Sequence, residues 1–166
     1  MFNKTDMNLS LNLIRKYRFD ELNDTLNAFK NFLFGEHYST VTIVQCHLVQ
    51  KITIMNEIID DGLDNQHQRL RMLKVLKEFK YKVKDLIDYV NMIINVKEFY
   101  EGLTSAFDAV KRYLNLVIEQ TNLNMEILSS IDGINIKTFN FDFVVDDDPF
   151  GEVVDSDIKK VDEKSI

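Results

Sequence analysis

Apolar residues recur at helical spacing along most of this chain. In the clearest series each step is four or three residues, in regular alternation: Met72, Leu76, Phe79, Val83, Leu86, Val90 and Ile93. That spacing places all of them on one face of an α-helix. Neither Gly nor Pro occurs from residue 64 to 101. The pattern therefore predicts one helix of about 38 residues, roughly 57 Å long.

Three further segments show the same periodicity. They run from Asn8 to Phe34, from Val41 to Ile59 and from Ser105 to Ile131. The apolar stripe of the first segment shifts along its length, so a break is expected near Phe19–Asp20. A glycine follows each segment, where a left-handed residue would end a helix. Short connections favour antiparallel neighbours, and residues 1–133 are therefore predicted to form an all-α, four-helix up-and-down bundle.

The pattern changes after Gly133. Phe139, Phe141 and Phe143 alternate with polar residues, which is the period-two pattern of a strand with one buried side. No second convincing strand is present to pair with this one. We therefore predict that residues 134–150 form an extended arm, which lies either in a groove of its own bundle or against another chain. Residues 151–166 are predicted to be an acidic, mobile tail.

Charge is concentrated at the C-terminal end. The chain has a formal net charge of −7, and residues 142–166 contain nine acidic residues and three lysines. A nearly neutral body argues against nucleic-acid binding, because sequence-independent binding to phosphates needs clustered cations. No apolar run is long enough to span a membrane, and no signal-peptide pattern opens the chain. Together with the single cysteine, this favours a cytoplasmic or virion-associated location.

The residues that could support chemistry form no strong motif. Cys46 lies within an apolar pattern and is expected to be a buried structural thiol. No two histidines have the spacing of a helical metal pair, and no phosphate-binding loop is present. We therefore expect no catalytic residue, no metal site and no cofactor.

Two acidic pairs offer an alternative. Glu57 with Asp60, and Asp85 with Asp88, resemble the paired acids with which all-α nucleoside triphosphate pyrophosphatases hold Mg²⁺. The resemblance implies a Mg-dependent nucleotide hydrolase. Heptad positions place all four acids on the faces turned away from the apolar seam, whereas metal-binding acids in a bundle project inward.

The sequence favours a non-catalytic assembly or adaptor protein that docks through its arm, as some structural components of virus particles do. The predicted partner-binding residues are Phe139, Phe141, Phe143, Val145 and Phe150. The expected partner is another protein or a second copy, which would make the chain a homo-oligomer. Besides the hydrolase, an acidic regulator or nucleic-acid mimic that inhibits a partner with a basic site stays open.

Overall fold

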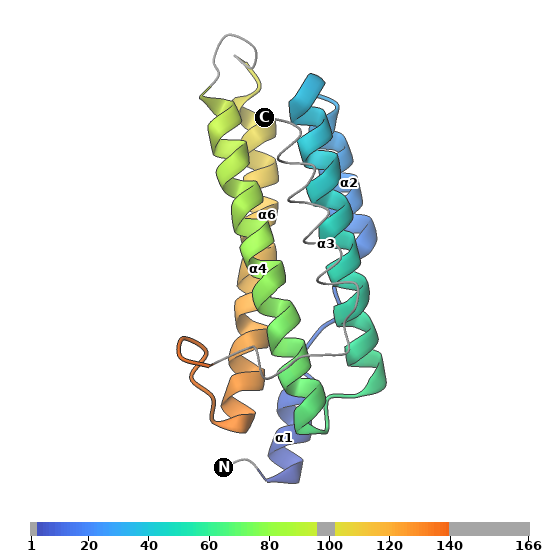
Figure 1. Cartoon of the computed structure of the whole chain (residues 1–166), viewed down its shortest axis with the longest axis vertical. Coiled ribbons are helices and arrows are strands. Elements are labelled where there is room, and N and C mark those ends of the chain that lie inside the picture. Colours follow the sequence, from blue (N-terminus) through green and yellow to red (C-terminus); the bar gives the residue numbers. More distant parts are fainter. Residues whose placement is uncertain (1–2, 96–101, 140–166) are drawn as a thin grey trace.

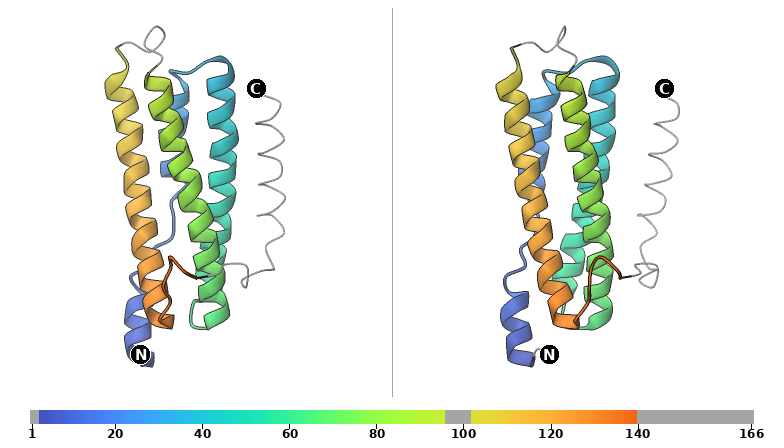
Figure 2. Two further views of the ribbon diagram at one scale, coloured as in Figure 1. Left: turned by 60° about the vertical axis from the view of Figure 1, so that its left-hand side comes forward. Right: turned by 90° about the vertical axis from the view of Figure 1, so that its left-hand side faces the viewer.

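The computed structural model describes residues 3–95 and 102–139, and this part of the chain is all-helical, without strands (Figure 1). Its helices are α1 (Lys4–Leu11), α2 (Phe19–Lys30), α3 (Gly35–Asp61), α4 (Gln66–Ile94) and α6 (Thr104–Asp132). The last four lie side by side, and successive ones run in opposite directions, whereas α1 lies at the end of the molecule where α6 terminates (Figures 1 and 2). The all-α prediction is confirmed. None of these helices is long and apolar enough to cross a membrane.

The apolar stripes of the helices meet in one core. All seven residues of the series beginning at Met72 are buried, each at most 1% exposed. The core continues through Leu26 and Phe29 of α2, Leu48 of α3 and Leu114 of α6. Edge-to-face ring contacts link the helices, with the centroids of Phe29 and Phe107 5.1 Å apart. Helical periodicity therefore identified the buried face of each long helix correctly.

The first predicted helix is divided into two. Residues 12–18 leave the helical path between α1 and α2, and Leu9 and Leu13 of the expected stripe are exposed. The cause is Tyr17, whose backbone is held by the side chain of Asn56 on α3. Asn56 Oδ1 accepts from the Tyr17 N–H at 2.9 Å, and Asn56 Nδ2 donates to the Tyr17 carbonyl at 3.0 Å. These bonds replace the helical partners of Tyr17, and α2 begins at Phe19, as the expected break indicated.

The third predicted helix is shorter than expected. α4 has 29 residues and ends at Ile94 instead of extending to residue 101. It begins where the Asn65 side chain accepts a hydrogen bond from the Gln68 N–H at 2.9 Å. At the other end the Asn95 N–H bonds to the Met92 carbonyl, a three-residue closure that tightens the last turn. Absence of Gly and Pro therefore did not determine where this helix ends.

The start of the predicted arm is a turn. Gly133 has φ +63° and ends α6, and the Ile134 N–H bonds to the Ser129 carbonyl at 2.8 Å. The Asn135 carbonyl then accepts from the N–H groups of Thr138 and Phe139, at 3.1 and 3.0 Å. These local bonds overturn the prediction of an extended backbone from residue 134 to 139. The remainder of the arm and the acidic tail, residues 140–166, lie outside the described residues.

Candidate docking groove

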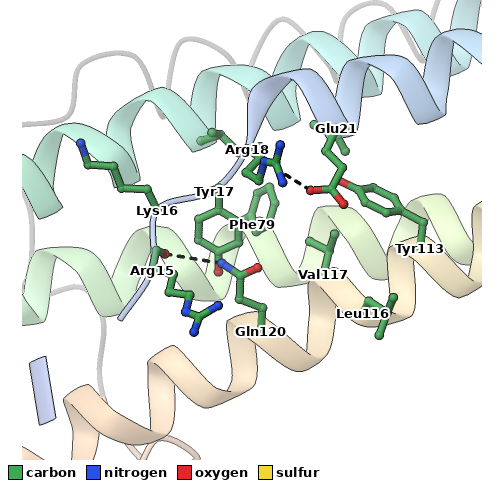
Figure 3. Close-up of a pocket in the computed structure, with 12 residues that line it drawn as sticks. Arg15, Lys16, Tyr17, Arg18, Glu21, Phe79, Tyr113, Leu116, Val117 and Gln120 are labelled. Carbon is green, nitrogen blue, oxygen red and sulfur yellow. Dashed lines mark hydrogen bonds and ion pairs between the residues drawn. The ribbon is translucent and has the colours of Figure 1, made fainter. Parts of the chain in front are cut away.

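The segment between α1 and α2 carries three basic residues, Arg15, Lys16 and Arg18. Asn56 holds this segment at Tyr17, and the Gln120 side chain of α6 donates to the Arg15 carbonyl at 3.5 Å. All three basic side chains are exposed. The segment therefore presents a short basic surface beside α6 (Figure 3).

Tyr17 points in the opposite sense, into the core. Its ring packs edge-to-face on Phe79 with centroids 5.1 Å apart (Figure 3). Its hydroxyl lies 2.8 Å from Thr121 Oγ1. Asn124 Nδ2 donates to the same hydroxyl at 3.4 Å. Burial raises the pKa of Tyr17 to about 12, although these two hydrogen bonds favour its ionised form. Tyr17 thus anchors the basic segment and remains neutral at physiological pH.

A pocket of about 210 Å³ lies beside this segment. Apolar side chains form its inner wall: Leu22, Ile52, Phe79 and Val117. Arg15 and Arg18 lie at its mouth (Figure 3). Arg18 Nε lies 3.7 Å from Glu21 Oε2, while Lys16 points away and pairs with Asp60. We call this the basic pocket, because three cations and one carboxylate line it.

A second pocket of about 320 Å³ lies between α2 and α6. Its lining is almost entirely apolar or small: Thr25, Ala28, Phe29, Phe32, Ala106, Ala109, Val110 and Tyr113. The alanines leave space between the two helices, and Phe32 is 41% exposed. We call this the apolar pocket. Tyr113 lines both pockets, so together they form one surface, the α2–α6 groove, which is apolar at one end and basic at the other.

Tyr113 is the half-buried phenol at the junction of the two pockets. Burial and the nearby Glu21 carboxylate raise its pKa to about 12, against the opposing effect of Arg18. At physiological pH its hydroxyl is therefore neutral and able to donate a hydrogen bond. The groove offers an acidic peptide apolar contacts, two arginines and a phenolic donor.

A third hollow, of about 580 Å³, lies on the side of α6 that faces α4. Most of its lining is polar or charged: Asn91, Ser105, Asp108, Lys111, Arg112 and Asn115, with Ile87 as the exception. Asp108 and Lys111 lie 3.4 Å apart and partly neutralise each other. Its lining is more polar than that of the apolar pocket, which makes the α2–α6 groove the stronger candidate for an aromatic side chain.

Of the predicted partner-binding residues, the structure describes only Phe139. It is half-buried and follows the Asn135 turn, while Ile134 and Ile136 pack against the core. Phe141, Phe143, Val145 and Phe150 lie outside the described residues. The base of the arm is thus fixed to the body beside the end of α6.

The alternative chemical sites are not brought together in the described residues. Glu57, Asp60, Asp85 and Asp88 are all exposed, as their heptad positions predicted. Within residues 3–95 and 102–139, no three His, Cys, Asp or Glu side chains are close enough to hold a metal ion.

The prediction of a buried Cys46 is wrong, because this thiol is exposed. At 100° per residue, Cys46 lies about 140° around α3 from the buried Val41. The histidine next to it, His47, is buried instead. A cysteine within an apolar stretch therefore need not share the face of its apolar neighbours.

Sequence reasoning missed the groove. The available signal was the run RKYR at 15–18, in which three of four residues are basic and the fourth is aromatic. Its importance depends on a backbone path that helical periodicity does not predict. Comparisons with protein families, curated proteins and solved structures found no match to this chain. The groove and the chemistry of the arm therefore carry the functional inference.

Proposed function

We propose that this protein is a non-catalytic assembly or adaptor protein, in which a four-helix up-and-down bundle docks onto a protein partner through its C-terminal arm. The observation that carries this proposal is that the first residues of the arm are held against the body. The Schellman turn at Gly133, the packing of Ile134 and Ile136, and the Asn135 turn fix where the arm leaves the body. A fixed starting point reduces the entropy that an attached peptide loses on docking.

The composition of the arm supports the same proposal. Beyond the Asn135 turn it presents phenylalanines at alternate positions, followed by Asp146, Asp147 and Asp148. Alternate rings suit an extended peptide that places one side in a groove. The carboxylates would set the rate and specificity of association more than its strength.

The α2–α6 groove is a binding surface and not a reaction centre in this proposal. Its two phenols, Tyr17 and Tyr113, have pKa values raised to about 12, so neither is a base at neutral pH. Its remaining lining residues are arginines, a lysine, a carboxylate paired with Arg18, a glutamine, a threonine and apolar side chains. Such a set binds and orients a peptide.

Photo-crosslinking from the arm tests the proposal. A benzophenone amino acid replaces Phe143 in the full chain, and a matched variant carries it at the exposed Tyr81 on α4. In the cells that produce the protein, irradiation is expected to join position 143 to a second polypeptide, while position 81 gives no such product. Crosslinks from position 143 only to the same chain would overturn the proposal, since the arm would then belong to the body.

Truncation gives an independent test. A chain that ends at residue 139 is expected to keep its helicity, with a free energy of unfolding within about 1 kcal/mol of the full chain. Circular dichroism during urea titration measures both quantities. A loss of several kcal/mol would show that residues 140–166 stabilise the bundle.

A further inference from the structure

The α2–α6 groove is apolar at one end and basic at the other, and in the arm the phenylalanines likewise come before the aspartates. Its apolar pocket is lined on α6 by residues 106–113 and its basic pocket by residues 113–120. From Ala109 to Gln120, α6 rises about 16 Å. In an extended arm, Asp147 lies about 13 Å beyond Phe143 and about 20 Å beyond Phe141. Phenylalanines in the apolar pocket would therefore place the aspartates at the basic pocket.

The arm of the same chain meets this groove in the wrong order. Phe139 lies near the C-terminal end of α6, where the Ile134 N–H bonds to Ser129. An arm that rises from there along α6 reaches the basic pocket first and the apolar pocket second. Its phenylalanines come before its aspartates in the sequence, so the rings would face the arginines and the carboxylates would face the alanines.

The arm is also too short to place Phe141 and Phe143 in the apolar pocket of its own chain. Phe141 and Phe143 can lie at most about 7 and 14 Å from Phe139 in a fully extended chain. Ala109 is twenty residues before Ser129, which is about 30 Å along α6. The two rings of one chain therefore cannot fill the apolar pocket of that same chain. An arm of another chain that enters from the N-terminal end of α6 meets the apolar pocket first and is not limited by this distance.

We propose that the α2–α6 groove binds the arm of a second copy of this chain, with Phe141 and Phe143 in the apolar pocket and Asp146–Asp148 at Arg15 and Arg18. This inference rests on the proposed function and names its partner. Opposite charges support a second copy as the occupant, because residues 141–148 carry four aspartates, whereas the basic pocket has Arg15 and Arg18 beside the single carboxylate of Glu21, with Lys16 paired to Asp60. The bound arm runs parallel to α6, from the end near Ala106 towards Gln120.

A complementation experiment with full chains tests this arrangement. The groove variant is Arg15→Glu/Arg18→Glu, and the arm variant is Phe141→Ala/Phe143→Ala. Both arginines are exposed, so the groove variant should fold. A matched control, Lys4→Glu/Lys84→Glu, makes the same charge change at exposed positions away from the groove. Sedimentation velocity measures self-association, and donor and acceptor dyes on the two variants report mixed pairs.

The wild-type chain and the charge control are expected to self-associate with equal affinity. Each variant alone should associate at least about 10-fold more weakly. An equimolar mixture of the two variants should form a 1:1 pair at least about 10-fold tighter than either variant with itself, since an intact arm then meets an intact groove. Higher salt should weaken the pair, because the aspartates and arginines attract each other less.

Two results would overturn the inference. One is a wild-type chain that remains monomeric at about 100 µM, which would place the Kd for self-association well above that concentration. The other is a mixture that associates no better than its components. If position 143 nevertheless crosslinks to a different protein, the proposed function stands and only the second copy is rejected. If position 143 crosslinks only within its own chain, both proposals fail.

Discussion

The buried face of α4 and the α2–α6 groove both contain apolar side chains, but the two surfaces differ in how far those side chains are buried. Phe79 lies at the centre of α4 and is fully buried, whereas Phe32 at the groove is 41% exposed. The large residues of the α4 face, from Met72 to Ile93, are each at most 1% exposed. In the groove, Ala28, Ala106 and Ala109 stand where larger side chains would close the space between α2 and α6. Side-chain size at a few positions therefore decides whether two helices close on each other or leave a surface for a peptide.

The largest expected effect is on the α4 face. Phe79→Ala removes a fully buried ring that packs on Tyr17, and it should lower the free energy of unfolding by about 3–5 kcal/mol. Urea denaturation followed by circular dichroism measures this change. Tyr81→Ala, at a position 54% exposed on the same helix, should change stability by less than about 0.5 kcal/mol. If Phe79→Ala fails to fold, Phe79→Leu should retain the fold with a smaller loss. Equal effects at 79 and 81 would contradict the assignment of the core.

Loss of the ion pair near the N-terminal end of α4 should lower the free energy of unfolding almost as much. Arg69 Nε and Nη2 donate to the two carboxylate oxygens of Asp132 on α6, each at 2.9 Å, and both side chains are less than 10% exposed. Asp132→Ala leaves the Arg69 charge buried and should cost about 3 kcal/mol. Asp108→Ala breaks the more exposed pair with Lys111 and should cost less than about 0.5 kcal/mol. Chemical denaturation of the two variants measures how much each ion pair contributes to the free energy of unfolding.

Tyr17 packs on Phe79 of the α4 face and also lines the basic pocket, and its ionisation should make stability depend on pH. Its pKa is about 12 in the folded chain and about 10 when exposed, so the folded state keeps the phenol neutral. The resulting contribution is fully present below pH 10 and is lost as the pH rises through 12, a fall of roughly 3 kcal/mol. The stability of Tyr17→Phe should decline less than that of the wild type between pH 9 and about 12. Urea titrations across this range measure the difference.

Tyr81→Phe is the control for the pH dependence and should follow the wild-type curve. At neutral pH, Tyr17→Phe loses the hydrogen bond to Thr121 and should cost about 1 kcal/mol. Parallel curves for Tyr17→Phe and the wild type above pH 10 would show that Tyr17 ionises as an exposed phenol.

The smallest effect on stability is expected in the groove, where binding should change most. Ala109→Leu fills the apolar pocket at an exposed helical position, so the free energy of unfolding should change by less than about 1 kcal/mol. Self-association should weaken at least about 10-fold, because the rings of the incoming arm lose their space. Asn115→Leu, exposed on α6 and outside this pocket, should leave self-association unchanged. Unaltered association in Ala109→Leu would argue against this pocket as the docking site.

Periodicity predicted the long helices well but not the groove. The apolar series of α4 is buried throughout, and Gly133 ends α6 as expected. The basic pocket depends on Asn56, which holds Tyr17 from 39 residues further along the chain. No local pattern predicts such a contact, because a side-chain amide can bond to any backbone that tertiary packing brings to it. The expected buried Cys46 was wrong for a related reason, since its orientation follows from the exact helical phase of α3.

By itself, the sequence determined the all-α class, the buried faces of the long helices and the end of α6 at Gly133. These features depend on residue spacing and on local turn chemistry, which act over a few residues. Only the tertiary structure decided that residues 12–18 leave the helical path and that three cations lie beside an apolar opening between α2 and α6. Those features arise from contacts between residues far apart in the chain, where packing and hydrogen bonding outweigh local preference.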